Sequence, residues 1–245
     1  MKQPRIPFNL ADALACAEAS QAAYAAQPDF SSPLMHALVQ SRSAGATALL
    51  AFRGTKNPVD LRTDAEGWRV CVAAGEVHYG FWHAWESVRQ QLYAWPAWSN
   101  GSPVYLAGHS LGGAVAQLCA WAMVREGRTA GPVRVYTVGS PRVGDRKWAD
   151  HYNLLLGDAT WQVINQVDAV PRMPGAFAGF HRAGRTAHLS ATGRILLEPK
   201  LLRATAMDVA AAAYDLRHFR LGCLADHAVQ DYVGRLRMAL QKALL

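Results

Sequence analysis

Ser110 is surrounded by glycines in the stretch GHSLGG, which also places a histidine directly before it. Residues 103–107 precede this stretch with the apolar pattern of a buried strand, and residues 111–127 follow it with the pattern of a helix. A G-x-S-x-G pentapeptide between a strand and a helix is typical of a nucleophile elbow, a sharp turn that exposes the serine hydroxyl. The free N–H groups and positive dipole at the start of the helix would stabilise a developing oxyanion. These features predict that Ser110 is a nucleophile.

Two other interpretations of the glycine-rich stretch are open at this point. It could be a turn that only joins a strand to a helix, or it could be an anion-binding loop. A P-loop is excluded, because no Lys-Ser or Lys-Thr pair follows the glycines. If Ser110 is a nucleophile, it needs a base, and the base needs a carboxylate that fixes its tautomer.

Asp168 is a candidate for this carboxylate, since it follows the strand-like residues 160–166. The carboxyl ends of parallel strands share one edge of a sheet, so we expect Asp168 on the same edge as Ser110. An alternative role for Asp168 is to cap the proline-rich turn that follows it through an Asx bond. Asp145 is a second candidate for the acid. The possible bases that follow Asp168 in the chain are His181, His188, His218 and His227.

The elements that would position these residues alternate between strands and helices, without an internal repeat or an obvious linker. Such alternation predicts one α/β domain, residues 1–245, with a mostly parallel central sheet covered by helices on both faces. Strands are expected at 47–52, 103–107, 133–139 and 160–166, with a hairpin at 185–198. Helices are expected at 8–27 with Asn9 as N-cap, at 77–95 after a turn around Gly80, and at 111–127, 145–157, 200–219 and 225–244.

The composition excludes several classes of protein. Hydrophobic residues make up 51% and charged residues 18% of the chain, which indicates a globular protein with a sizeable core. The net charge is +7, but the arginines are scattered without interleaved aromatic residues, so we expect no nucleic-acid partner and at most a weak attraction to anionic lipid. The sequence contains no apolar stretch of about 18 residues, so we expect no membrane span. A secretion signal is also lacking, so we expect a cytoplasmic protein, although leaderless export would leave the same sequence.

The four cysteines are far apart and have neither C-x-x-C spacing nor histidine-rich surroundings, so we expect no disulfide and no zinc site. Cys16, Cys71 and Cys119 fall in helix-like or strand-like segments and are expected to be small buried side chains. Cys223 is the fourth cysteine.

Several ordered motifs together resemble the class 3 lipases, the fungal-type branch of the α/β-hydrolases. They run from Ala51 to Tyr232 and are AFRGT, VHYGF, GHSLGGA, TVGSPRVGD, NQVDAVPRMP and DHAVQDY, with ASQAAY as a weaker match before them. The resemblance implies an α/β-hydrolase fold. We also expect a monomer, with no metal and no organic cofactor.

The resemblance also assigns the partners of Ser110. The acid of this family lies in a D-x-V-P context, which here is that of Asp168, whereas Asp145 occupies a structural loop position. The base lies in a D-H-x-x-Y pattern, which implies His227, with His181 as a distant second candidate. Tyr232 comes two residues later than the pattern requires. Asp226, directly before His227, is expected to be a helix N-cap.

The oxyanion donors are also implied by the resemblance. They are the backbone N–H groups of Thr55, in AFRGT, and Leu111, with the Thr55 hydroxyl as a further donor. We expect Arg53 to anchor this loop, the alternative being a phosphate-binding arginine. His109, beside the nucleophile, is expected to be packed rather than catalytic.

Two segments are candidate covers of the site. Residues 58–68 occupy the place of the family's lid, but they carry four charged residues and few large apolar ones, so strong interfacial activation is not expected. The apolar residues within 198–219 line an acyl groove in one interpretation and belong to the core in the other.

These features together predict hydrolysis of lipid esters, with Ser110, His227 and Asp168 as the catalytic triad. A hydrophobic ester would be the substrate, and contact with a lipid surface would be transient. A phospholipase A1 or a feruloyl-type esterase would share the same residues. A lipase-like interaction protein without turnover is the alternative from another class.

Overall fold

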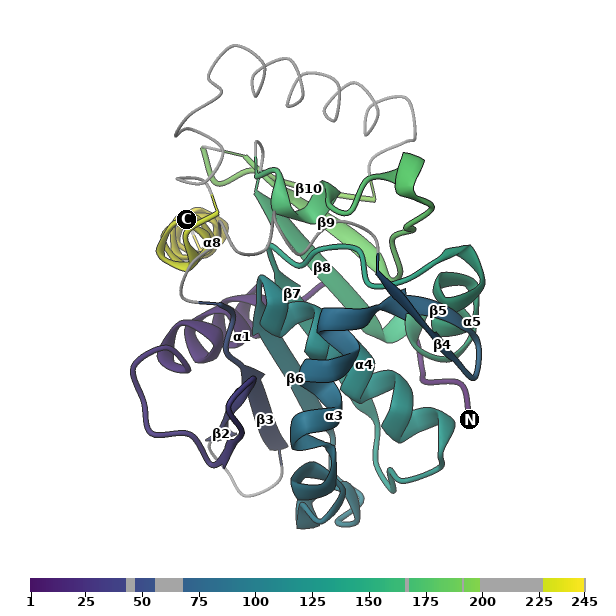
Figure 1. Ribbon diagram of the computed structural model, residues 1–245. Helices are drawn as coiled ribbons and strands as arrows, with labels where there is room; N and C mark the ends of the chain where they lie inside the picture. Colours follow the sequence, from purple (N-terminus) through teal and green to yellow (C-terminus); the bar gives the residue numbers. More distant parts are fainter. Residues whose placement is uncertain (43–46, 56–67, 166–167, 191, 199–226, 245) are drawn as a thin grey trace.

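The computed structural model describes residues 1–42, 47–55, 68–165, 168–190, 192–198 and 227–244 (Figure 1). Its centre is an eight-stranded sheet with the strand order β1-β2-β3-β6-β7-β8-β9-β10. The strands are β1 (Phe30–Ser31), β2 (His36–Arg42), β3 (Thr47–Phe52), β6 (Val104–His109), β7 (Val133–Val138), β8 (Thr160–Asn165), β9 (Arg185–Leu189) and β10 (Ile195–Leu197).

The middle of this sheet is parallel, from β3 through β6, β7 and β8 to β9, and antiparallel pairs extend it at both ends. The register aligns the carboxyl ends of the central strands, since Gly108 lies opposite Phe52 on one side and Thr137 on the other. The loops that leave β3, β6 and β8 therefore begin at one edge of the sheet. Each of these three loops carries a predicted site residue, namely Thr55, Ser110 and Asp168.

Helices cover both faces of the sheet, as predicted (Figure 1). The helices α3 (Tyr79–Tyr93), α4 (Leu111–Arg125) and α5 (Arg146–Leu156) pack against one face of the sheet and form a large apolar core with it. The helices α1 (Leu10–Ala22) and α8 (Val229–Ala243) pack side by side on the other face, in a second core. Both faces of the sheet are thus covered, and all six residues of β6 and of β8 are buried, including the polar Thr160, Gln162 and Asn165 of β8.

Local capping fixes the ends of several helices. Asn9 caps α1 by accepting a hydrogen bond from the Asp12 N–H, and Asp145 caps α5 by accepting one from the Trp148 N–H. Gly127 ends α4 in the left-handed conformation, with φ at +65°. Asn9 and Gly127 were predicted in these roles from the sequence.

The structure differs from the predicted elements in three places. Strands β1 and β2 were not predicted, and neither was the separate hairpin of β4 (Arg69–Val72) and β5 (Gly75–His78). Gly80 is the second residue of α3 and not part of a turn before it. Cys71 is exposed in β4, because a two-stranded hairpin leaves one side in water, whereas Cys16 and Cys119 are buried as expected.

Short 3-10 helices complete the described part of the chain: η1 (Pro96–Trp98), η2 (Gly157–Ala159), η3 (Val170–Arg172) and η4 (Ala176–Ala178). No described helix is both long enough and apolar enough to cross a membrane. The predicted helix at 200–219, the fourth cysteine Cys223 and all of the candidate lid except Trp68 lie outside the described residues.

Candidate active site

Ser110 occupies the turn between β6 and α4 in a backbone conformation that residues other than glycine rarely adopt, with φ at 57° and ψ at −130°. The glycines around it explain how the turn closes. A Cβ atom on Gly108 would lie 2.2 Å from the carbonyl oxygen of Gly112, and one on Gly112 would lie 2.2 Å from that of Phe52. Any side chain at either position would therefore collide with backbone, as the elbow interpretation requires.

Asp168 and His227 form a buried pair near this turn. The Nδ1 atom of His227 lies 2.8 Å from Oδ2 of Asp168, and both side chains are almost completely buried. A carboxylate can only accept, so Nδ1 of His227 carries the proton and Nε2 faces away from the acid as the free position of the ring. Nε2 is buried and has no hydrogen-bond partner among the described residues.

Asp168 makes the contacts that both of its alternative roles require. Its Oδ1 atom accepts from the backbone N–H of Val170 at 2.9 Å, which is the Asx bond that starts the proline-containing turn η3. Its Oδ2 atom accepts from His227 and from the hydroxyl of Tyr232, at 2.6 Å. One carboxylate thus fixes its own loop and orients the imidazole.

His109 places His227 on the same side of the molecule as Ser110. Its ring lies 4.5 Å from the ring of His227, measured between centroids, and its Nε2 atom is 2.7 Å from the carbonyl oxygen of His227. Gly139, with φ at +61°, leaves the room for this arrangement. A Cβ atom there would lie 3.0 Å from both Asp168 Oδ2 and His227 Cε1.

The loop after β3 reaches the elbow at Gly54. A Cβ atom on Gly54 would lie 3.2 Å from that of Ser110 and 2.7 Å from the carbonyl oxygen of His109. Thr55, the predicted oxyanion donor, is the next residue, and its hydroxyl is buried without a partner within the described chain. The other predicted donor, Leu111, is the first residue of α4, where backbone N–H groups have no acceptor inside the helix.

The other candidates from the sequence are not part of this arrangement. Asp145 caps α5, and the His181 side chain makes no hydrogen bond to the described residues. His188 is buried in β9. His218 and Asp226 lie outside the described residues.

The start of the last helix differs from the prediction. His227 lies in a turn before α8, which begins at Val229, and the N-cap residue is Ala228 rather than Asp226. Because His227 is not in the helix, its ring can turn back toward the sheet edge.

Tyr232 is a further functional candidate, although in the sequence it is only a deviation from the D-H-x-x-Y pattern. Besides donating to Asp168, its hydroxyl accepts from the backbone N–H of Asn165 at 3.0 Å. Burial, together with the neighbouring charge of Asp168, raises the pKa of Tyr232 well above its usual value, so the hydroxyl remains a donor. From the first turn of α8, Tyr232 reaches the acid despite its shift of two positions in the sequence.

Replacing Tyr232 by phenylalanine is expected to lower the free energy of unfolding by about 1–3 kcal/mol, because the buried Asn165 N–H and Asp168 lose a partner. It should also lower kcat about tenfold with little change in KM, since the acid would no longer be fixed. Urea unfolding and steady-state kinetics measure both quantities. Tyr152→Phe is the matched control, because it removes another buried hydroxyl, bonded to Thr160 at 2.8 Å, without touching the site. An unchanged kcat in Tyr232→Phe would contradict the prediction.

The burial of His109 predicts a pH dependence of stability. Burial, with a smaller contribution from His227, lowers the pKa of His109 from 6.5 to about 3. Between these two values the unfolded chain binds a proton that the folded chain does not. This group therefore lowers the free energy of unfolding as the pH falls below 6.5, by up to about 1.4 kcal/mol per pH unit.

Urea unfolding of the wild type and His109→Gln between pH 7 and pH 4.5 measures this contribution. As the pH falls, we expect the free energy of unfolding to decrease more steeply in the wild type than in His109→Gln. The difference in slope should approach that of one bound proton. His227, Tyr24 and Tyr232 surround His109 and are present in both proteins, so the comparison isolates the effect of the substituted ring. Equal slopes would show that His109 binds a proton as readily in the folded protein as in the unfolded chain, which would contradict the prediction.

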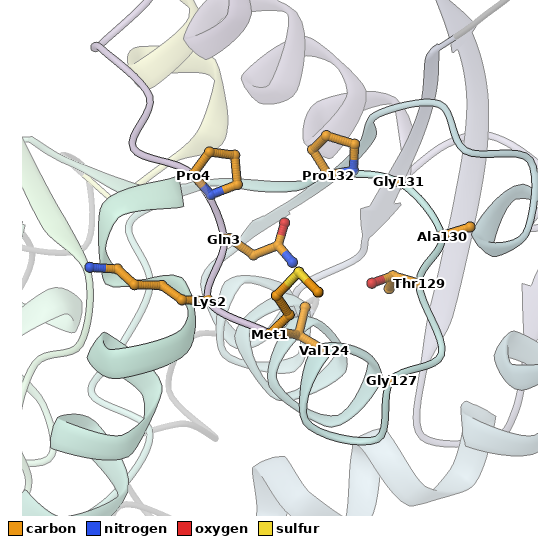
Figure 2. A pocket seen from close by; sticks show the side chains of 10 residues that line it. All are labelled: Met1, Lys2, Gln3, Pro4, Val124, Gly127, Thr129, Ala130, Gly131 and Pro132. Carbon is orange, nitrogen blue, oxygen red and sulfur yellow. The ribbon is translucent and has the colours of Figure 1, made fainter.

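A pocket of about 420 Å³ lies away from this site (Figure 2). Its lining comes from the first residues of the chain, the end of α4 and the segment before β7, and comprises Met1, Lys2, Gln3, Pro4, Val124, Gly127, Thr129, Ala130, Gly131 and Pro132. These segments adjoin the amino ends of the parallel strands, so the pocket is at the edge opposite Ser110. Among the described residues, no group of three or more His, Cys, Asp or Glu side chains is arranged to hold a metal ion.

The family model for class 3 lipases matches residues 49–178, which is more than half of the chain. The chain therefore belongs to the class 3 lipase family, and the predicted α/β-hydrolase fold is confirmed.

The relatives of the chain include several lipases. A lipase of Rhizomucor miehei is 32% identical over 162 residues, which are 61% of this chain and 43% of that protein. A structure of that lipase with its propeptide is similar to 79% of this chain and 73% of its own, with a TM-score of 0.68 and 23% identity.

Two further relatives carry more specific descriptions. A secreted mono- and diacylglycerol lipase of Fusarium solani is 34% identical over 59% of this chain and 44% of its own length. A triacylglycerol lipase, described as having a serine protease triad at its catalytic centre, is 28% identical with a TM-score of 0.58, over 66% of this chain and 64% of its own. The chain spans less than half the length of the two curated relatives.

Proposed function

We propose that this protein hydrolyses carboxylic esters of acylglycerols or related lipids, with Ser110 as nucleophile, His227 as base and Asp168 as acid. The observation that carries the proposal is the buried contact of 2.8 Å between His227 and Asp168, next to a serine held in a strained turn. Membership of the class 3 lipase family supports it independently.

In the first half of the reaction, the Ser110 hydroxyl attacks the ester carbonyl while Nε2 of His227 takes its proton. The resulting imidazolium is stabilised by Asp168, whose position is already fixed by Val170 and Tyr232. His227 then returns the proton to the leaving alcohol, which leaves Ser110 acylated. In the second half, water attacks the acyl group with the same base, and the fatty acid leaves.

The oxyanion would be held by the backbone N–H groups of Thr55 and Leu111. Each donor of this kind is worth about 3 kcal/mol of transition-state stabilisation. The buried hydroxyl of Thr55 supports a third donor, because it has no partner in the described structure and its loop packs on the elbow at Gly54.

The proposed substrates follow from the relatives, which are described as lipases of mono-, di- and triacylglycerols. The cationic surface, with a net charge of +7, supports a transient contact with an anionic lipid surface, which would weaken at high salt. We propose that the protein acts as a monomer.

Labelling with a fluorophosphonate, followed by peptide mass analysis, tests the nucleophile. We expect a single adduct on the peptide that contains Ser110, and labelling of a different serine would refute the assignment. Assays with p-nitrophenyl esters of graded chain length then test the substrate class. A preference for medium or long acyl chains supports a lipase, whereas absence of hydrolysis at every length would indicate a non-catalytic interaction protein. Parallel assays with phosphatidylcholine and with feruloyl esters distinguish a phospholipase A1 and a feruloyl-type esterase.

A further inference from the structure

His109 is a buried polar residue that the proposed reaction does not use. It is the last residue of β6, directly before Ser110, and its side chain is 5% exposed. Both nitrogen atoms of its ring have a partner at 2.7 Å. Nε2 contacts the carbonyl oxygen of His227, and Nδ1 contacts the hydroxyl of Tyr24, which follows α1 in the chain.

These partners determine where the protons lie. A carbonyl oxygen can only accept, so Nε2 of His109 carries a proton and donates it to His227. The ring is neutral because burial lowers the pKa of His109 to about 3. Nδ1 is then an acceptor and receives the proton of the Tyr24 hydroxyl. Burial raises the pKa of Tyr24 to about 12, so this hydroxyl stays protonated.

The chain of hydrogen bonds continues to the loop after β3. The Tyr24 hydroxyl accepts a backbone hydrogen bond from Gly54, and Gly54 has no room for a side chain because a Cβ atom there would lie 2.3 Å from the Tyr24 oxygen. Gly54 directly precedes Thr55. Two side chains thus connect the backbone beside the oxyanion donor to the backbone of the base.

We propose that Tyr24 and His109 are positioning residues, which hold the loop of His227 and the loop of Thr55 at fixed places relative to Ser110. This proposal rests on the proposed function, in which His227 is the base and Thr55 an oxyanion donor. Neither residue touches the substrate. The pair acts through backbone atoms, and its neutral state keeps a second positive charge away from the imidazolium that forms on His227.

Two substitutions of His109 separate its two bonds. The amide nitrogen of glutamine can occupy the place of Nε2 and donate to the His227 carbonyl, whereas the amide oxygen of asparagine can occupy the place of Nδ1 and accept from Tyr24. We expect His109→Asn to lower kcat about 10- to 100-fold with KM changed less than about twofold, because the base loses its anchor. His109→Gln should retain kcat within about fivefold of the wild type. Tyr24→Phe, which leaves His109 in place, should lower kcat about three- to tenfold.

A readout independent of turnover separates this proposal from the proposed function. The proton shared by His227 and Asp168 is expected as a far-downfield resonance in the proton NMR spectrum. It should broaden or shift in His109→Asn and persist in His109→Gln, even if no ester is hydrolysed. The control Tyr152→Phe should lower stability but leave both kcat and this resonance unchanged.

Two results would overturn the proposal. One is that folded His109→Asn and His109→Gln have equal kcat values and equal resonances, and the other is that Tyr24→Phe matches the wild type in both. If His109→Asn does not fold, Tyr24→Phe decides by the same two measurements. A wild type that neither reacts with a fluorophosphonate nor hydrolyses any ester would instead refute the proposed function.

Discussion

Replacing Ser110 by alanine is expected to lower kcat/KM for any ester substrate by about 10⁴-fold or more, because no other group can form the acyl-enzyme. The loss should be confined to kcat, since binding of the acyl chain does not need the hydroxyl. Stability should change by less than about 1 kcal/mol, because the Ser110 side chain makes no hydrogen bond to the described residues. Steady-state kinetics and urea unfolding measure the two effects.

Ser110→Gly is the informative companion of this variant. Both variants lack the nucleophile, but only glycine adopts φ at 57° and ψ at −130° without strain. Such strain costs about 1–3 kcal/mol, part of which is offset by the greater freedom of glycine in the unfolded chain. We expect Ser110→Gly to be about 1 kcal/mol more stable than Ser110→Ala. Equal stabilities would show that the turn stores no strain, and full activity in either variant would exclude Ser110 as the nucleophile.

Replacing His227 by alanine is expected to lower kcat almost as much as loss of the serine, because nucleophile and base act as one unit. Asp168→Asn should lower kcat about 10⁴-fold, since an amide donates to Nδ1 and forces the wrong tautomer of His227. The double variant of Ser110 and His227 should be no worse than either single variant. Kinetics on folded protein, checked by circular dichroism, give these values.

His181→Ala is the matched control for His227→Ala. His181 also follows the acid in the chain, but its contact with the described structure is a backbone pairing with Gly144. We therefore expect its kcat to remain within about twofold of the wild type. Loss of activity in His181→Ala with an active His227→Ala would refute the assignment of the base.

The alternation of strands and helices was sufficient to predict the parallel sheet, because neighbouring parallel strands need a crossover connection, which is usually a helix. The elbow was also predictable, since the G-x-S-x-G pattern between a strand and a helix is local in the sequence. Gly108 is required by a contact inside the turn, whereas the contact of Gly112 with Phe52 of β3 could not be inferred from the pattern. Strands β1 and β2 were missed. They lie at the edge of the sheet, where side chains of mixed exposure give no clear period.

The contacts between distant segments could not be predicted in the same way. Nothing in the sequence near Tyr24 indicates that its hydroxyl lies 2.7 Å from a ring nitrogen 85 positions later. Tyr232 lies two positions later than the family pattern requires, yet its hydroxyl contacts Asp168. The number of residues between His227 and Tyr232 does not reveal the angle at which α8 packs on the sheet. For Asp168, the contact with the turn and the contact with the imidazole do not compete, since a carboxylate has two oxygen atoms and each has its own partner.

Because each oxygen atom of Asp168 has its own partner, few other side chains could replace it at position 168. Glutamate has the same charge, but its extra methylene would move the carboxyl group about 1.5 Å farther from the backbone. The glutamate carboxylate could then keep the hydrogen bond with the Val170 N–H or the one with the His227 imidazole, but not both. An asparagine would keep the turn and fail at the imidazole. We therefore expect that neither glutamate nor asparagine at position 168 preserves both contacts.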